Sequence, residues 1–216
     1  MTPSPPPSAP APRASRHFIL ALVAGAAILA LLPHVDLWAW HHVRMTRVYD
    51  HDWGRLLRVA GFAPTWIVGA VAIMLARSGR AVTAGWKAAL LPGWFLLASI
   101  AASGLLGEVV KLVVRRERPG PHDGLYGYLP WIGDWSTGAI GLPSTHAIVA
   151  FAGAFALARL SPRSGPVWVG VALGCGLTRL LDGKHFVSDV LAAGVLAWVI
   201  VALLDEALRP ERLEVR

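Results

Sequence analysis

The chain has 216 residues, of which 55% are hydrophobic and 15% are charged, whereas roughly 25% of the residues in an ordinary soluble domain are charged. This composition excludes a water-soluble enzyme, which would need more polar surface to cover its core, and it excludes an intrinsically disordered protein. The remaining class is an all-α, polytopic membrane protein. The formal net charge of +7 comes without a nucleic-acid-binding pattern, so we expect lipid headgroups near the basic residues and no nucleic-acid partner.

Six apolar segments follow a tail, residues 1–17, whose Pro-, Ala- and Ser-rich sequence predicts disorder. The segments cover residues 18–40, 56–76, 88–110, 147–160, 167–177 with its flanks, and 190–204. Several are shorter than the ~20 residues of a usual span, so their helices must extend into flanking residues. We therefore predict six transmembrane helices in a domain of residues 18–206, followed by a short charged tail, residues 207–216.

The cores of these segments contain no Asp, Glu, Lys, Arg or His. A channel or an ion-coupled transporter usually places ionisable groups at mid-depth, so the pattern favours chemistry at one membrane face. The first segment also permits a second interpretation as a cleaved signal peptide, because Arg13 and Arg16 precede it. Residues 33–40 have no convincing small-residue cleavage site, which disfavours this interpretation.

Loop charge gives the predicted orientation. With a cytoplasmic amino end, each face receives ten basic residues. If some outer cations are kept for a ligand, they do not report on topology, and the inner loops then carry the excess of positive charge. We predict a multi-pass protein of the cell inner membrane, with both termini in the cytoplasm.

The longest connection joins the third and fourth segments and covers about thirty-five residues, from Lys111 to Thr145. Loops of this length in a compact protein are usually functional or disordered. The connection begins with a basic run that includes Arg118, and it ends with Ser144 and His146 immediately before the next segment. It is therefore the first candidate for a functional loop.

A second loop, between the fifth and sixth segments, supplies Arg179, His185 and Asp189. Both loops follow an odd-numbered segment, so both lie on the same membrane face whichever way the protein inserts. We therefore expect their side chains to meet in one site, on the periplasmic face in the predicted orientation.

The residue types in the two loops suit chemistry on a phosphate. Lysine and arginine bind phosphate oxygens, and His146 and His185 can exchange protons near neutral pH. If the stretch after His185 is helical, Asp189 lies one turn away, where a carboxylate can hold the imidazole in one tautomer. The hydroxyl of Ser144 and the first N–H groups of the following helix add a natural site for an anion.

Taken singly, these residues also have structural interpretations. The basic run can be a juxtamembrane anchor, to which we assign Arg115 and Arg116. The pair of His185 and Asp189 can be a helix-start hydrogen bond or half of a metal site. The other histidines of the amino-terminal half lack cysteines or ordered carboxylates nearby, so no metal site is predicted.

Three motifs occur in order and distinguish these interpretations. They are Lys111 with Arg118 and Pro119 (K-x6-R-P), then Pro143, Ser144 and His146 (P-S-x-H), then Arg179, His185 and Asp189 (R-x5-H-x3-D). Together they resemble the signature of the type 2 phosphatidic-acid phosphatase superfamily, and the six-segment layout is similar to its membrane branch. Thr145 stands where the family usually has Gly, and Thr178 where it usually has Ser.

The resemblance implies a phosphatase that needs neither a metal nor another cofactor. It implies that His185 attacks phosphorus and forms a phosphohistidine, that Asp189 orients His185, and that His146 protonates the leaving oxygen and then activates water. The residues that it implies for binding the phosphoryl oxygens are Lys111, Arg118, Ser144, Thr145 and Arg179.

We expect an amphiphilic substrate, because the site lies at headgroup depth. The candidates by resemblance are undecaprenyl pyrophosphate, phosphatidylglycerol phosphate, phosphatidic acid and the phosphates of lipid A. Two alternatives stay open: a lipid phosphotransferase that uses the same phosphohistidine, and a non-catalytic transporter or binding protein that keeps the phosphate pocket. The sequence carries no signal for an oligomeric state.

Overall fold

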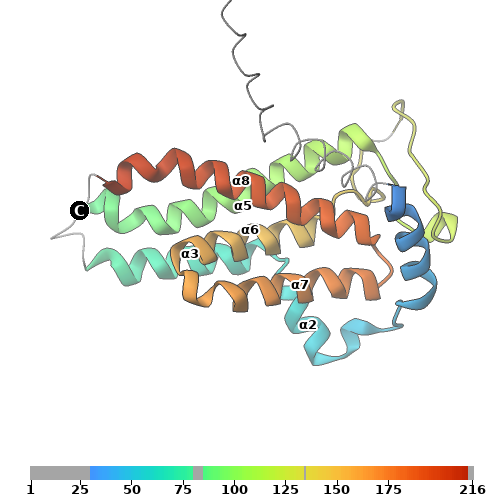
Figure 1. Cartoon of the computed structure of the whole chain (residues 1–216), viewed down its shortest axis with the longest axis horizontal. Helices are drawn as coiled ribbons and strands as arrows, with labels where there is room; N and C mark the ends of the chain where they lie inside the picture. Colours follow the sequence, from blue (N-terminus) through green and yellow to red (C-terminus); the bar gives the residue numbers. More distant parts are fainter. Residues whose placement is uncertain (1–29, 80–84, 134, 214–216) are drawn as a thin grey trace, which may run out of the picture.

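The computed structural model describes residues 30–79, 85–133 and 135–213, and helices form its framework (Figure 1). The helices are α2 (Asp52–Val59), α3 (Ala63–Ser78), α5 (Trp86–Val114), α6 (Thr145–Leu160), α7 (Gly165–Leu181) and α8 (Val187–Leu213), preceded by a helix over residues 30–42. Three short 3-10 helices are η1 (Val48–Asp50), η2 (Gly120–His122) and η3 (Pro162–Ser164). The predicted all-α class is confirmed for these residues.

Helix α6 is the centre of the bundle, packed against α5, α7 and α8. Most of its buried positions are alanines, and Gly153 accepts the Trp66 ring so closely that an added Cβ would lie 2.4 Å from a ring atom. Small residues let helix backbones approach each other. Protein therefore surrounds most of α6, which has only 16 residues.

Three helical stretches are long and apolar enough to cross a membrane: Ala89–Val114, Pro162–Leu181 and Val187–Leu208. The pair α2 and α3 would count as a fourth span if its two bent parts are taken together, while α6 is apolar but shorter than a span. Six spans are therefore not confirmed for the part of the chain described above. The membrane character itself agrees with these apolar helices.

The predicted continuous segment over residues 56–76 is interrupted in the structure. Helices α2 and α3 meet at an angle of 62°. Gly61 lies at the break, where an added Cβ would approach the Cβ of His146 to 2.7 Å, and Pro64 occupies the first turn of α3, a position that favours a helix start. The bend brings α2 close to the amino end of α6.

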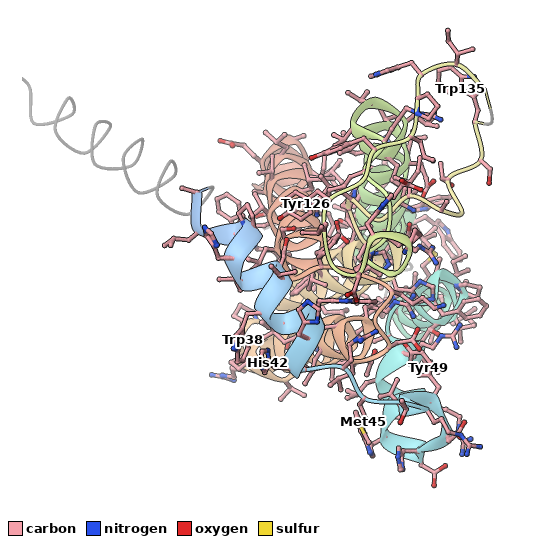
Figure 2. All side chains as sticks on the ribbon, turned by 90° about the vertical axis from the view of Figure 1, so that its right-hand side faces the viewer. Trp38, His42, Met45, Tyr49, Tyr126 and Trp135 are labelled. Carbon is pink, nitrogen blue, oxygen red and sulfur yellow. The ribbon has the colours of Figure 1, made fainter. Side chains whose placement is uncertain are left out.

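Only the end of the predicted first span, residues 18–40, lies within the described residues. The helix over residues 30–42 lies across one end of the bundle rather than alongside α5 to α8 (Figures 1 and 2). Its Asp36 is 1% exposed and accepts hydrogen bonds from Tyr126 and from Ser188 of α8. This part of the predicted span is therefore attached to the loop end of the bundle.

The two predicted tails have different outcomes. The amino-terminal tail, residues 1–17, lies outside the described residues. At the other end, α8 continues to Leu213, so the predicted domain boundary at residue 206 falls inside a helix. The division into a domain of residues 18–206 and a tail of residues 207–216 stays a prediction.

Candidate active site

The site lies where two connections meet at one end of the bundle: residues 115–144, between α5 and α6, and residues 182–186, between α7 and α8 (Figures 1 and 2). Backbone hydrogen bonds fold the longer connection back on itself, from Arg118 N–H to Ala139 O at 3.1 Å and from Gly141 N–H to Arg116 O at 2.8 Å. The Ser144 N–H then donates to the backbone oxygen of Asp189 at 3.2 Å. These bonds tie the long connection to the start of α8.

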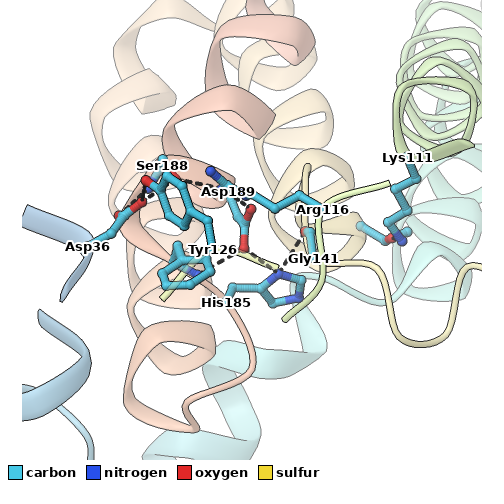
Figure 3. Close-up of polar contacts among 10 residues, drawn as sticks. Asp36, Lys111, Arg116, Tyr126, Gly141, His185, Ser188 and Asp189 are labelled. Atoms are coloured by element: carbon cyan, nitrogen blue, oxygen red, sulfur yellow. Dashed lines mark hydrogen bonds and ion pairs between the residues drawn. The ribbon is translucent and has the colours of Figure 1, made fainter. Parts of the chain in front are cut away.

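His185 is 5% exposed, and its Nδ1 lies 3.0 Å from the backbone oxygen of Gly141 and 3.3 Å from Oδ2 of Asp189 (Figure 3). Both neighbours only accept hydrogen bonds, so Nδ1 must carry the proton. The Nε2 lone pair is then available to a substrate. Burial lowers the pKa of His185, although Asp189 opposes the shift, so the neutral imidazole predominates near neutral pH.

Asp189 is completely buried and belongs to the first turn of α8. Its Oδ2 accepts from the Phe186 N–H at 2.9 Å as well as from His185, an arrangement typical of a helix-capping carboxylate. Its Oδ1 accepts from Arg116. The same carboxylate therefore caps the helix and contacts the histidine.

His146 is half-buried in the first turn of α6. It interacts electrostatically with Arg179, Arg118 and His185. Arg58 of α2 also acts on it, and the Arg58 guanidinium lies 4.6 Å from the centre of the Tyr49 ring. The two predicted proton-transfer histidines thus share one cluster of cations.

Three buried donor atoms of this cluster have no hydrogen-bond partner among the residues that the structure describes: Ser144 Oγ, Arg118 Nε and Arg179 Nε. A buried polar group without a partner costs about 1–3 kcal/mol. The pKa of Arg118 is lowered by burial and then by the charge of Arg179, so an anion between the two guanidiniums would stabilise both. A phosphate, with several acceptor oxygens, fits these donors.

Arg179 is held by neighbours that sequence reasoning did not identify. Its Nη1 donates to the hydroxyl of Tyr49 at 2.7 Å, and the Asp182 carboxylate lies 3.9 Å away. The Tyr49 hydroxyl in turn donates to the backbone oxygen of Thr178 at 3.3 Å. Tyr49 therefore orients the guanidinium with one contact and leaves Nε of Arg179 to a ligand.

Lys111 lies on the last turn of α5, and its ammonium is buried against Glu108 and Thr145. Lys111 Nζ is 3.0 Å from Glu108 Oε1 and also donates to Thr145 Oγ1, which itself donates to Glu108 at 3.0 Å. Thr145, the departure from the family pattern, thus binds the lysine through its hydroxyl. Glu108 was not predicted from the sequence, because a carboxylate three residues before a lysine is common on helix surfaces.

The assignment of Arg115 and Arg116 to a juxtamembrane anchor is wrong, because both residues are buried in the protein, with 2% and 5% of their surface exposed. Arg115 ends α5 in a left-handed conformation, with φ 55°, and the turn directs the chain inward. Arg116 is then buried against Asp189 and Ser188, while Arg115 lies against the Trp135 ring at 5.2 Å. Helical spacing alone does not predict this reversal, because it depends on where the helix stops.

Comparison with known proteins gives matches to the part of the chain that contains most of this cluster. A family model described as the PAP2 superfamily matches residues 92–208. The curated relatives include a lipid A 1-phosphatase from Rhizobium etli (strain ATCC 51251 / DSM 11541 / JCM 21823 / NBRC 15573 / CFN 42) and another from Rhizobium johnstonii (strain DSM 114642 / LMG 32736 / 3841). Each is 35% identical over 153 residues, which cover 64% of this chain and 63% or 60% of the relative. The match thus spans less than two thirds of these relatives, and no solved structure matches the chain.

Proposed function

The chain belongs to the PAP2 superfamily, and we propose that it is a membrane phosphatase that hydrolyses a lipid phosphate. The observation that carries this proposal is the set of unpartnered donors, Ser144 Oγ, Arg118 Nε and Arg179 Nε, in a cluster with a neutral His185. Donors prepared for an anion beside a free imidazole nitrogen suit phosphoryl transfer. The names of the relatives support the same class of substrate.

In the proposed first step, Nε2 of His185 attacks phosphorus. The N–P bond forms, the bond from phosphorus to the lipid oxygen breaks, and His146 gives its proton to that oxygen. The proton on Nδ1 of His185 stays in place, because Gly141 O and Asp189 accept it. Those two acceptors stabilise the positive charge that the imidazole gains as it bonds to phosphorus.

In the second step, a water molecule attacks the phosphohistidine. His146, now neutral, takes a proton from the water, the N–P bond breaks, and inorganic phosphate leaves. Lys111, Arg118 and Arg179 stabilise the equatorial oxygens in both steps, with Ser144 and the backbone N–H of Thr145. We propose that these cations replace a metal ion as the source of positive charge.

Among the candidate substrates, we propose the 1-phosphate of lipid A. Both named relatives are lipid A 1-phosphatases, and each is 35% identical to this chain over 153 residues. We propose that the protein acts in the inner membrane with its site on the periplasmic face, where the predicted orientation puts both loops.

An apolar cavity of about 500 Å³ supports a lipid substrate. Residues of α2, α3, α6 and α7 line it, and Ala60 at its edge is followed by Gly61, which contacts His146. The cavity therefore lies beside the segment that packs against His146. We infer that an acyl chain of the substrate occupies it.

The function is tested with purified protein in EDTA and a panel of four lipids: lipid A, undecaprenyl pyrophosphate, phosphatidylglycerol phosphate and phosphatidic acid. We expect release of inorganic phosphate, fastest from the 1-position of lipid A. In water labelled with oxygen-18, the released phosphate should carry one labelled oxygen. Abolition of turnover by EDTA would contradict the metal-free mechanism, and appearance of the phosphate on a second lipid would indicate a phosphotransferase.

Filling the cavity should reduce turnover of lipid substrates selectively. Gly69 lines the cavity and has no neighbour within 4 Å of an added Cβ, so Gly69→Leu should displace two or three methylenes of the acyl chain. At about 0.8 kcal/mol for each methylene, kcat/KM for a long-chain lipid phosphate should fall about 10- to 60-fold. Hydrolysis of the water-soluble p-nitrophenyl phosphate should be unchanged.

The matched control is Gly170→Leu on α7, where an added Cβ also meets nothing within 4 Å and the cavity is not touched. This variant should act on both substrates like the wild type. Equal losses on the lipid and on the soluble substrate in Gly69→Leu would argue against an acyl chain in the cavity.

A further inference from the structure

Arg116 is buried between the catalytic pair and the amino-terminal helix. It is 5% exposed, and its Nη2 donates to Oδ1 of Asp189 and, at 2.6 Å, to Oγ of Ser188 (Figure 3). Its guanidinium carbon lies 4.6 Å from the centre of the Tyr126 ring and 5.1 Å from that of Phe186. Two charge-assisted hydrogen bonds and two rings fix the side chain in one position.

The contacts continue to Asp36 on the helix over residues 30–42. Asp36 accepts from the Ser188 N–H at 2.9 Å, from the Ser188 hydroxyl at 2.5 Å and from the Tyr126 hydroxyl at 2.6 Å. Burial and Asp36 raise the pKa of Tyr126 to about 12, so the phenol remains a neutral donor. A continuous chain of hydrogen bonds thus runs from Asp36 through Ser188, Arg116 and Asp189 to His185.

The two oxygens of Asp189 have separate partners. Oδ1 accepts from Arg116, whereas Oδ2 accepts from the Phe186 N–H and from His185. Arg116 therefore determines the plane of the carboxylate and balances part of its charge. Without that cation, Asp189 would hold the proton of His185 more strongly, because a nearby opposite charge favours the protonated imidazole.

We propose that Arg116 is a positioning residue of the phosphatase: through Asp189 it keeps His185 Nε2 unprotonated and aimed at the phosphate, while Ser188, Tyr126 and Asp36 hold Arg116 in place. The expected effect of Arg116 on catalysis rests on the proposed function. Its expected effect on the protonation of His185 does not, because that effect follows from charges and contacts in the protein alone. Arg116 occupies one of the six unspecified positions of the first motif, so the motif itself assigns it no role.

The charged groups that face His185 determine the sign of the expected change. They are Asp189 from α8, Arg179 from α7, His146 from α6 and Arg118 from the long connection. Arg116→Gln removes a cation that offsets Asp189 and leaves the other groups in place. The pKa of His185 should therefore rise, and the neutral nucleophile should be lost at a higher pH than in the wild type.

The test compares Arg116→Gln and Arg116→Lys with a matched control, Arg159→Gln. Arg159 pairs with Asp205 at 2.9 Å, at the other end of α6 from His146, so the control also removes an arginine from an Arg–Asp pair. Two quantities are measured for each protein: the pH profile of kcat/KM for a lipid phosphate, and the titration of His185 by NMR with nitrogen-15 histidine, assigned with His185→Gln.

For Arg116→Gln we expect kcat to fall about 10- to 100-fold with KM nearly unchanged, and the acidic limb and the His185 titration to move up by about one pH unit. Arg116→Lys keeps the charge, so it should keep the wild-type pH profile and recover part of kcat. The control should match the wild type in both measurements. If Arg116→Gln is too unstable to purify, the kcat of Arg116→Lys tests the inference instead. A merely structural role predicts that Arg116→Lys has the same kcat as the control Arg159→Gln, whereas a positioning role predicts a lower kcat.

An unshifted His185 titration in Arg116→Gln, or a kcat of Arg116→Lys equal to that of the control, would overturn the inference. Failure of the proposed function gives a different result: the wild type would release no phosphate from any lipid, while the His185 titration would still respond to Arg116.

Discussion

Replacing His185 by glutamine is expected to reduce phosphate release by about 10⁴- to 10⁶-fold, the range seen when an enzyme loses its nucleophile. The glutamine side chain fills most of the buried space, so the loss should reflect chemistry rather than unfolding. Gly141 O and Asp189 both contact Nδ1 of His185, so Nε2 is the ring nitrogen left for attack on phosphorus. Release of phosphate in EDTA measures the effect.

His122→Gln is the matched control. His122 belongs to the same long connection but is partly exposed and pairs with Glu117 at 2.7 Å, away from the cluster. It should keep the wild-type rate. A His185→Gln protein with the activity of this control would show that another group attacks phosphorus.

The intermediate can be observed directly with His146→Gln. p-Nitrophenyl phosphate has a leaving group that needs little protonation, so the first step should still proceed, whereas water is no longer activated for the second. Radiolabelled phosphate should then accumulate on the protein in an acid-labile, alkali-stable form. Labelling that persists in a double variant with His185→Gln would exclude His185 as the carrier.

Replacing Arg118 by alanine is expected to lower kcat about 10²- to 10³-fold, as for the loss of one preorganised donor to a developing charge. Its Nε is buried without a partner among the described residues, so the side chain has no structural contact at that atom to lose. Arg118→Lys should recover only part of the rate, because an ammonium cannot present the planar fork of a guanidinium. Steady-state kinetics with lipid phosphate measures both.

The control for this prediction is Arg47→Ala. Arg47 pairs with Asp50 and its side chain is 83% exposed, and an exposed ion pair contributes little to stability. This variant should change neither kcat nor KM. If Arg118→Ala raised KM and left kcat intact, Arg118 would bind the ground state and the transition state equally, contrary to the proposed role.

The sequence alone was enough to predict the all-α class and to predict that the three motifs meet at one end of the bundle. The motif residues lie at or just after the end of α5, at the start of α6, at the end of α7, and on both sides of the start of α8. Apolar segments that alternate in direction bring such ends together, whatever their lengths. The local order Pro-Ser-x-His also places Ser144 at the amino cap of α6, where such a residue is favoured.

Other features depend on tertiary contacts that a linear pattern does not contain. The apolar run over residues 56–76 is continuous, and the bend within it arises where Gly61 contacts His146. The closest partner of His185 is the backbone oxygen of Gly141, and a carbonyl group has no sequence signature. Asp36 belongs to no motif, yet it is buried, and Ser188 and Tyr126 donate hydrogen bonds to its carboxylate.

The dependence of His185 on Gly141 and of Asp189 on Arg116 has a consequence for biogenesis. Helices enter the membrane in the order of their synthesis, and the long connection is made before α7 and α8 exist. Two of its atoms, Gly141 O and Arg116 Nη2, can form their hydrogen bonds only after His185 and Asp189, around the start of α8, have been made. A nascent chain therefore contains Lys111 and Arg118 early, but the proposed phosphate site is complete only after α7 has added Arg179 and the start of α8 has added Asp189.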